Sequence, residues 1–552
     1  MTSLPELGPD GLARTSALAN LQLADIAPSA VVEFVSRGRC LIIGHEGAAL
    51  ALARGLGDRL ECVISVPGEA TLELDRIDGL RTVRGGRPLV RGALGDFEVV
   101  LVAGGRSQDL CALLAVPFDR FDLVVDLSTP PLLRQAMPPL GYYATGTDDD
   151  SRATLLATLP EMRGEFEKPK YFNYNPEICA HGRSGKRGCT RCIDACPAEA
   201  IISIGEKVEV NPYLCQGGGA CAMACPSGAM TYAFPSARDL LTAMRGALNA
   251  YRAAGGASAC VLFHDPSSAE ALEGHLAAAM PERVLPVAIE EIGSVGMDTW
   301  FACLAYGAEA VVILASDRTP PQVIEALQLQ LATARAMLAG IGHEESRLCV
   351  INSDQPAAAL EALRGLPSGQ SRQAATFATP AFDKRGTLRL ALHHLQGQAV
   401  STKRVTPLPE GSPFGEVRVN AAACTLCMSC VSACPTHALQ DGRGLPQLNF
   451  REWNCVQCGL CERTCPEDAI TLVPRFLHDE ELREKPRVLH EEQPVCCVAC
   501  GKPFATRAML DKLSRKLEGH WMFQTEEARR RLQMCEDCRV RDLFVAEARK
   551  SR

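Results

Sequence analysis

Residues 424–435 read CTLCMSCVSACP, and residues 455–466 repeat the same spacing as CVQCGLCERTCP. A [4Fe-4S] cluster needs thiolates that converge on neighbouring irons. A tightly wound C-x2-C-x2-C loop can direct three of them at one cluster, while the cysteine before proline reaches across to a second cluster. The two stretches therefore predict two [4Fe-4S] clusters, with the ligand sets Cys424, Cys427, Cys430 and Cys465, and Cys455, Cys458, Cys461 and Cys434.

Zinc is the alternative content of such a block. Zinc ribbons, however, use two separated C-x2-C pairs rather than three closely spaced cysteines and a Cys-Pro. The spacing at 424–466 therefore favours iron.

A short phrase, C-P-x-x-A followed by an apolar residue, occurs four times in the chain, beginning at Cys196, Cys225, Cys434 and Cys465. Four copies are hard to obtain by accident. The two early copies belong to a first cysteine-rich block at about 171–235.

The first half of this block lacks a cysteine at the first place of the motif. Lys186 stands there, and Cys179 lies seven residues earlier, beyond the polar loop AHGRSGKRG at 180–188. Such a loop could swing Cys179 back onto the same cluster. One [4Fe-4S] cluster is therefore expected between Cys179, Cys189, Cys192 and Cys225.

The second half of the block, CQGGGACAMACP at 215–226, has Gly218 at the second place. Glycine has no ligating side chain. The cysteines left for this site are Cys215, Cys221 and the crossing Cys196. Three thiolates fit a [3Fe-4S] cluster, or a [4Fe-4S] cluster whose fourth iron is bound by water, a partner or a distant side chain. Decay of the site is the remaining alternative.

The C-terminal segment contains two C-x2-C pairs, and the order CGKPF follows the first pair. This pattern resembles a zinc ribbon or treble-clef knuckle, and it has no Cys-Pro crossing partner for an iron cluster. Structural zinc is therefore expected between Cys497, Cys500, Cys535 and Cys538, with Cys496 spare. Buried structural thiols are expected at Cys40, Cys62, Cys111, Cys260, Cys303 and Cys349.

Composition narrows the class of protein. A chain of 552 residues is too long to fold around a single hydrophobic core, so several domains are expected. The net charge of −8 disfavours nucleic acid as a partner and favours docking to a basic patch on another protein. No stretch reaches the roughly 18 to 20 apolar residues of a membrane span, and the N-terminus has no secretory pattern. With 26 cysteines best explained as ligands and buried thiols, a cytoplasmic protein is expected.

The two cysteine blocks resemble bacterial dicluster ferredoxins, as in polyferredoxins, and the first block is similar to the seven-iron kind that has lost one cysteine. Residues 293–316, GSVGMDTWFACLAYGAEAVVILAS, resemble the small delta-type domain of methanogen hydrogenase and heterodisulfide reductase subunits, which passes electrons between partners. The paired cysteines of that family are absent here. The whole layout is similar to iron-sulfur proteins that accompany molybdenum or tungsten formate dehydrogenases.

The predicted fold is α/β multidomain. Two ferredoxin-like dicluster (α+β) modules are interleaved with two α/β parallel-sheet domains, which short apolar runs alternating with helical stretches indicate, and a zinc-ribbon-like segment ends the chain. The expected boundaries are 1–170 and 236–400 for the α/β domains, 171–235 and 401–475 for the modules, and 476–552 for the C-terminal segment.

Several clusters in one chain favour an electron-transfer protein that connects redox partners, and the resemblance implies formate dehydrogenase subunits among them. Two alternatives stay open. The open iron of the three-cysteine site could serve an enzyme, or the chain could be a maturation or scaffold factor for a metalloenzyme. The sequence contains no conventional acid-base or nucleophile constellation, so no catalytic residue is assigned.

Overall fold

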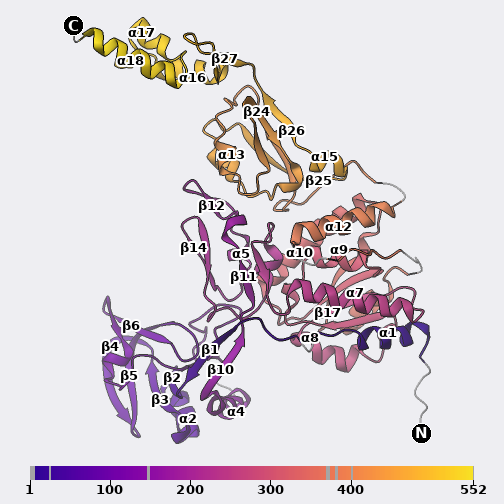
Figure 1. Cartoon of the computed structure of the whole chain (residues 1–552). Coiled ribbons are helices and arrows are strands. Elements are labelled where there is room, and N and C mark those ends of the chain that lie inside the picture. Colours follow the sequence, from indigo (N-terminus) through magenta and orange to yellow (C-terminus); the bar gives the residue numbers. More distant parts are fainter. Residues whose placement is uncertain are drawn as a thin grey trace.

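The computed structural model describes residues 7–23, 26–145, 149–368, 373–378, 383–399 and 402–550. It is a mixed α/β structure with several separate sheets. Figure 1 shows the C-terminal helices extending away from the rest of the chain at the top of the view. Among the described residues, no helix has both the length and the apolar character needed to cross a bilayer.

The N-terminal sheet has the strand order β7-β6-β5-β3-β2-β8-β9, with β4 added on β5. The strands β5, β3, β2, β8 and β9 run parallel, whereas β4, β6 and β7 are antiparallel to their neighbours. The bounds are β2 Arg39–Ile43, β3 Glu61–Val66, β4 Gly68–Ile77, β5 Leu80–Arg91, β6 Glu98–Ala103, β7 Arg106–Asp109, β8 Leu123–Asp126 and β9 Tyr142–Ala144.

This sheet is less parallel than the sequence pattern indicated. Residues 1–170 were expected to form a parallel-sheet domain, but strand β6 of this domain pairs antiparallel with β5. The connection at 92–97 is too short for a parallel crossover, which needs about a dozen residues or more. Helices α2 (Glu46–Leu56) and α4 (Asp149–Thr158) contact one another beside the sheet.

The first module follows directly from this domain. Strand β1 (Val31–Ser36) pairs antiparallel with β10 (Gly164–Pro169), and the chain then enters the cysteine block. The module consists of short antiparallel pairs and two single-turn helices: β11 Phe172–Tyr174 with β16 Met230–Tyr232, β12 Gly182–Arg183 with β13 Lys186–Arg187, β14 Ile201–Ile204 with β15 Lys207–Val210, α5 Arg191–Asp194 and α6 Ala220–Ala224.

The second α/β domain has a fully parallel sheet in the order β18-β17-β19-β20. All four strands are short apolar runs, as is typical of a parallel sheet covered on both faces. Ser236 caps the first helix of the domain, since its Oγ accepts from Asp239 N at 3.2 Å. The bounds are β17 Cys260–His264, β18 Val284–Ala288, β19 Ala310–Ala315, β20 Leu348–Asn352, α7 Ala237–Ala253, α8 Pro266–Ala271, α9 Met297–Ala305, α10 Pro321–Gly340, α11 Pro356–Arg364 and α12 Lys384–Gly397.

Helix α1 (Pro9–Ala19) packs on α7 in the core of this second α/β domain, although residues 1–170 were expected to form one N-terminal domain. Ala13 and Ala17 are fully buried there. Glu282 accepts hydrogen bonds from Gly8 N at 3.1 Å and from Gly11 N at 3.2 Å, which fixes the start of the helix.

The second module ends later in the chain than residue 475. Strand β26 (Arg487–Glu491) completes one of its two three-stranded sheets, in the order β23-β24-β26. The other sheet has the order β21-β25-β22. The remaining bounds are β21 Val405–Pro407, β22 Gly415–Val419, β23 Leu439–Gly442, β24 Leu445–Phe450, β25 Ile470–Leu477, α13 Ser429–Ala433, α14 Leu460–Thr464 and α15 Glu480–Glu484.

The C-terminal segment contains one hairpin and three helices, with bounds β27 Pro494–Cys496, β28 Pro503–Thr506, α16 Arg507–Leu517, α17 Glu526–Arg531 and α18 Glu536–Lys550. Thr506 Oγ1 accepts from Met509 N at 3.2 Å and thereby caps α16. The same hydroxyl donates to Thr425 O at 3.1 Å, which ties the segment to the second module.

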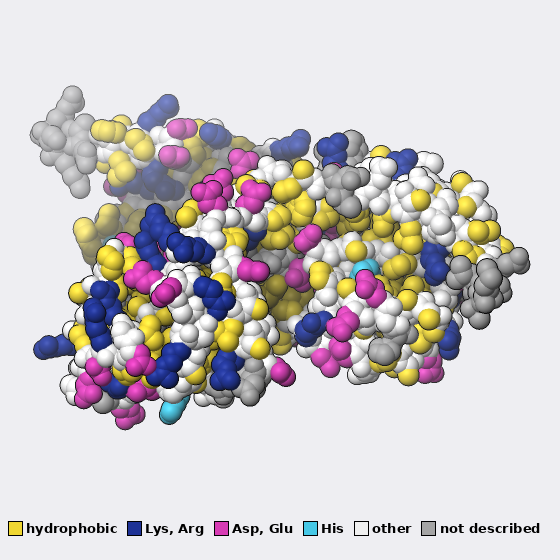
Figure 2. Space-filling view, turned by 90° about the horizontal axis from the view of Figure 1, so that it is seen from below, with side chains coloured by type: hydrophobic (Ala, Val, Ile, Leu, Met, Phe, Trp, Pro, Cys, Tyr) yellow, Lys and Arg dark blue, Asp and Glu magenta, His cyan; other side chains and the backbone are white. Residues whose placement is uncertain are grey.

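Charged side chains of both signs share the surface. Figure 2 shows the face seen from below, where Lys and Arg side chains alternate with Asp and Glu over the lobe at the left of the view. Among the described side chains visible on that face, neither charge forms a large continuous area.

Candidate iron-sulfur and metal sites

The structure brings together both predicted cysteine sets of the second module. Two small cavities lie in it, and each is lined by one set. We call them site 3, with Cys434, Cys455, Cys458 and Cys461, and site 4, with Cys424, Cys427, Cys430 and Cys465. In each set the fourth cysteine comes from the other motif, as the crossing arrangement predicts.

Site 2 is the set Cys179, Cys189, Cys192 and Cys225. The loop at 180–188 forms the β12–β13 hairpin, and Cys189 N donates to Ala180 O at 2.9 Å, so the chain returns to Cys179 after the insertion. Burial raises the pKa of Cys192, and the neighbouring charges of Cys225, Cys189 and Cys179 raise it further. Cys179, Cys192 and Cys225 belong to one packed cluster, and the hairpin brings Cys189 next to Cys179, so the four predicted ligands lie close together.

Site 1 is the three-cysteine set Cys196, Cys215 and Cys221, which lines a third cavity. Burial raises the pKa of Cys215 and, more strongly, that of Cys221. Enclosed thiols need a compensating cation to ionise, as a metal cluster supplies. Above the loop, Tyr232 Oη donates to Gly217 O at 2.8 Å, and Tyr171 stacks on Tyr232 with ring centroids 6.0 Å apart.

Each of the three glycines at 217–219 faces a different neighbour. A Cβ on Gly217 would lie 3.0 Å from the Tyr171 ring, and one on Gly219 would lie 2.4 Å from Ser294 N. A Cβ on Gly218 would lie 2.9 Å from Met137 Sδ. The N-terminal domain and the stretch 293–316 therefore both press directly on the loop of site 1, and side chains on these glycines would collide with them.

The C-P-x-x-A repeat has a structural reason. The third residue after each crossing cysteine has a positive φ, at Glu199, Gly228, His437 and Asp468. This left-handed turn directs a following backbone N–H at the cysteine sulfur. The resulting bonds are Ala200 N to Cys196 at 3.4 Å, Met230 N to Cys225 at 3.3 Å, Ala438 N to Cys434 at 3.2 Å and Ala469 N to Cys465 at 3.4 Å. Hydrogen bonds to cluster sulfurs are one determinant of reduction potential.

A cysteine thiolate of one site affects the pKa of a cysteine in the neighbouring site. Burial raises the pKa of Cys221 in site 1, and Cys192 of site 2 adds to the shift. Burial likewise raises the pKa of Cys461 in site 3, with a contribution from Cys430 of site 4.

The junction between the modules shows the same proximity. Burial raises the pKa of Cys189 in site 2 to about 11, and Cys458 of site 3 contributes. Helix α5, which contains Cys192, contacts helix α6, which contains Cys221; helices α13 and α14, which contain Cys430 and Cys461, also contact each other, and α14 contacts β13 across the junction of the modules.

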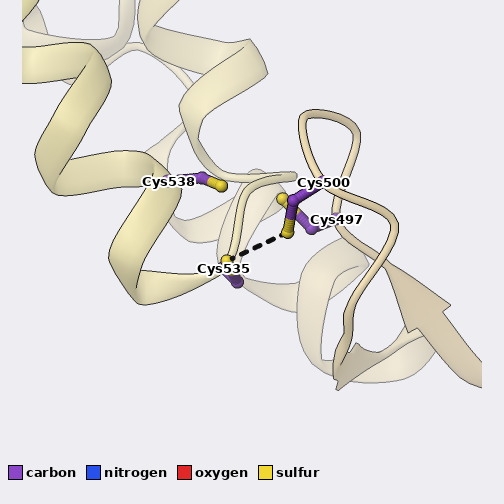
Figure 3. A group of neighbouring side chains, drawn as sticks. All are labelled: Cys497, Cys500, Cys535 and Cys538. Atoms are coloured by element: carbon purple, nitrogen blue, oxygen red, sulfur yellow. Dashed lines mark hydrogen bonds between the residues drawn. The ribbon is translucent and has the colours of Figure 1, made fainter.

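Four further cysteines gather in the C-terminal segment (Figure 3). The sulfurs of Cys497, Cys500, Cys535 and Cys538 all lie within 4.8 Å of one another, and Cys500 Sγ is 3.7 Å from Cys535 Sγ. A tetrahedral zinc ion with Zn–S bonds of about 2.3 Å places its sulfurs about 3.8 Å apart. The donor set and its spacing thus fit one zinc ion.

The electrostatics of this group also favour a thiolate. The pKa of Cys497 falls to about 6: burial acts to raise it, but backbone N–H groups of Cys535, Ala499 and Cys500 donate to the sulfur. Among the described residues, this is the one group of three or more metal-ligating side chains gathered that tightly. Cysteines of a cubane cluster bind different irons and therefore lie farther apart.

The six isolated cysteines are buried, apart from the partly exposed Cys349. Cys40 and Cys62 lie opposite each other on β2 and β3. A hydrogen bond between the two thiols, together with burial, raises the pKa of Cys40. Ionisation of Cys40 is thereby disfavoured, whereas the same hydrogen bond lowers the pKa of Cys62.

Two protein-family models match the chain within these modules. A 4Fe-4S dicluster domain matches residues 423–470, and a 4Fe-4S binding domain matches residues 208–231. The chain thus contains ferredoxin-type iron-sulfur domains. The second match includes Cys215 and Cys221 of site 1, the loop with Gly218 between them, and Cys225 of site 2.

Curated relatives match over short stretches. The chain is 42% identical over 50 residues to Ferredoxin-1 of Caulobacter vibrioides, covering 9% of this chain and 42% of the relative. It is 42% identical over 45 residues to the ferredoxin-type protein NapF of Escherichia coli K12, covering 8% and 27%. It is 35% identical over 80 residues to indolepyruvate oxidoreductase subunit IorA of Pyrococcus horikoshii, covering 14% and 11%. The chain thus spans less than half the length of these relatives.

Three side chains near the sites were missed by the sequence analysis: Met137, Lys384 and Arg385. Each comes from a domain without clusters, and none has a spacing relation to a cysteine. Only the folded structure brings them to the modules.

Proposed function

We propose that the chain is an electron relay in which sites 1 to 4 hold four iron-sulfur clusters in a row. The ferredoxin-type domains and the ferredoxin and oxidoreductase-subunit relatives support iron-sulfur electron transfer. Bound at these sites, the clusters would accept and release single electrons. Beyond iron-sulfur electron transfer, we propose the number of clusters and a direct path for electrons between the two modules.

The observation that carries the proposal is the contact between the two modules at their cysteine loops. A Cβ on Gly188, next to Cys189, would lie 2.7 Å from Leu460 Cγ, which stands between Cys458 and Cys461. Arg463 Nη1 also crosses the junction and donates to Arg187 O at 2.5 Å. Site 2 and site 3 thus approach each other through directly packed loops, which gives electrons a short path from one module to the other.

The two ends of the row differ. Cys427 of site 4 is exposed, and this end lies beside the C-terminal segment through the Thr506–Thr425 hydrogen bond. Site 1 is enclosed by Tyr171, Met137 and Ser294. We therefore propose that a redox partner exchanges electrons at site 4, and that a second partner works through the domains around site 1.

The C-terminal segment is proposed to be a structural zinc element that shapes the surface beside site 4. The pair Lys512 and Glu467 supports this, because it joins α16 to the residue two positions after Cys465. The partners are proposed to be cytoplasmic redox proteins, among them formate dehydrogenase subunits, on the strength of the similar layout of cysteine blocks and α/β domains. Co-purification of an active dehydrogenase with this chain would test that assignment.

Anaerobic purification followed by metal analysis and redox titration tests the relay. We expect about four iron-sulfur clusters and one zinc ion per chain, with clusters that are reduced and reoxidised reversibly and no substrate turnover by the isolated chain. Zinc in place of iron in the modules, or iron for two clusters only, would overturn the proposal. A chain that turns over a substrate without a partner would favour the enzyme alternative.

A further inference from the structure

The loop of site 1 keeps the backbone of an intact motif although its second cysteine is missing. In the complete motifs, the residues two and four positions after the first cysteine have positive φ values, 53° and 61° at Leu426 and Met428, and 53° and 80° at Gln457 and Gly459. The corresponding residues of site 1, at 217 and 219, have φ values of 80° and 71°. A decayed site would have no reason to keep this left-handed double turn, which glycine adopts at both positions.

Gly218 therefore stands at the backbone position of Cys427 and Cys458, and a side chain there would take the direction of a ligand. The atoms nearest to its Cβ position are Met137 Sδ at 2.9 Å and Pro197 Cγ at 3.0 Å. Pro197 follows Cys196, which is the crossing cysteine of this site, and it lines the same cavity. The Met137 sulfur thus lies against the Cβ position of Gly218, which, with Pro197, lines the cavity itself.

Met137 is held in this position by its backbone. Its N–H donates to Pro197 O at 3.1 Å, a bond from the N-terminal domain to the first module. The rest of its segment is fixed to the N-terminal domain, because Leu94 N donates to Leu140 O at 2.7 Å and Leu133 N donates to Tyr142 Oη at 3.1 Å. The position of the Met137 side chain is therefore fixed by hydrogen bonds of its segment to the N-terminal domain and to the first module.

We propose that the thioether of Met137 is the fourth ligand of the site 1 cluster and replaces the thiolate that Gly218 cannot supply. Thioether sulfur is a soft ligand, like thiolate, and is suited to iron-sulfur clusters. It carries no negative charge, so the cluster is reduced more easily than one with four thiolates. The proposal rests on the proposed function in one respect, since it requires a cluster at site 1.

Met137→Leu tests the proposal, because leucine keeps the volume and removes the sulfur. Met162→Leu, in the same domain and packed against its own core, is the matched control. Each protein is purified without oxygen, and iron content, Mössbauer spectra and electron paramagnetic resonance (EPR) spectra after brief oxidation are compared. We expect Met137→Leu to lose about one iron per chain and to gain a [3Fe-4S] signal, with Met162→Leu unchanged from wild type.

Equal iron content and equal spectra in wild type and Met137→Leu would overturn the proposal, while three intact clusters at sites 2 to 4 would leave the relay itself standing. Failure to find those three clusters would instead count against the proposed function. The double variant Met137→Ala/Gly218→Cys guards against a folding defect: it should regain the full iron content with a lower potential at site 1. A double variant that keeps the [3Fe-4S] signal would also contradict the proposal.

Discussion

Lys384 and Arg385 are consecutive residues in the first turn of α12, and their side chains donate hydrogen bonds to different modules. Lys384 Nζ donates to Ala222 O at 2.6 Å and to Met223 O at 2.8 Å, beside site 1 and site 2. Arg385 Nη2 donates to Cys455 O at 2.5 Å, in site 3. A helix of the second α/β domain therefore contacts both modules, and places two basic side chains next to their cysteine loops.

Replacement of Arg385 by glutamine should lower the potential of the site 3 cluster. The guanidinium lies 4.4 Å from the centroid of the Phe414 ring, its Nη1 is buried without a hydrogen-bond partner among the described residues, and burial lowers its pKa to about 10, so it is charged at neutral pH. Removal of a buried positive charge disfavours addition of an electron nearby. Redox titration followed by EPR measures the shift.

Arg389→Gln is the control for this experiment. Arg389 is on the same helix, and its guanidinium pairs with the carboxylate of Glu484 at 3.2 Å. A fall of the same size in both variants, or no fall in Arg385→Gln, would show that Arg385 does not tune site 3.

Replacement of Cys538 by serine should remove zinc and destabilise the C-terminal segment while the iron content stays the same. A closed structural zinc site contributes directly to folding. Zinc analysis, iron analysis and limited proteolysis of the segment provide the readouts. Cys496→Ser is the matched control, because Cys496 is exposed and lies outside the group of four. If Cys538→Ser instead lost the iron of one cluster, the C-terminal segment would hold an iron-sulfur cluster of the relay and not structural zinc.

His437 offers a test of the repeated left-handed turn. It is exposed and has a φ of 52°, a conformation that costs a β-branched residue more than glycine. His437→Gly should keep the Ala438 N–H on Cys434 and retain site 3, whereas His437→Val should destabilise it. Cluster loss in the presence of an iron chelator is the measurement. Equal rates of loss in the two variants would show that the turn does not support the cluster.

The pH dependence of stability should change on replacement of Glu291 by glutamine. Burial, with the charges of Asp265 and Glu290, raises the pKa of Glu291 to about 7. The unfolded carboxyl ionises near pH 4.3, so the unfolded state releases its proton first and stability is lost as the pH rises from about 4.3 to 7. Wild type should lose more thermal stability than Glu291→Gln between pH 5 and pH 8. Parallel curves for the two proteins would contradict this account.

The cysteine ligand sets could be predicted from the sequence because most cysteines of one set lie close together along the chain. Three ligands of site 4 lie within seven residues, Cys424 to Cys430, and the crossing cysteine is marked by its proline. The hairpin that returns Cys179 was also predictable, since a polar loop with glycines separates it from Cys189. The spacing of the cysteines, the proline after each crossing cysteine and the polar loop are therefore enough to predict which cysteines group together.

The remaining features depend on contacts between distant segments. Helix α1 has an apolar face, but nothing in residues 9–19 indicates that the face packs on α7. Strands β4 and β5 contain many polar residues, and their pairing is set by the hairpin at Asp78 and Gly79. Met137 meets Gly218 only after two domains dock. For such contacts, a single sequence carries no periodic or spacing signal.

Spin coupling between the modules tests the relay most directly. Fully reduced wild-type protein should give a split and broadened EPR spectrum from neighbouring paramagnetic clusters. Replacement of both Cys458 and Cys461 by alanine removes two ligands of site 3, and the clusters of sites 2 and 4 should then give narrower signals. Four magnetically isolated signals in the wild type, or a spectrum in the variant that differs only by subtraction of one cluster, would contradict a continuous row of clusters across the two modules.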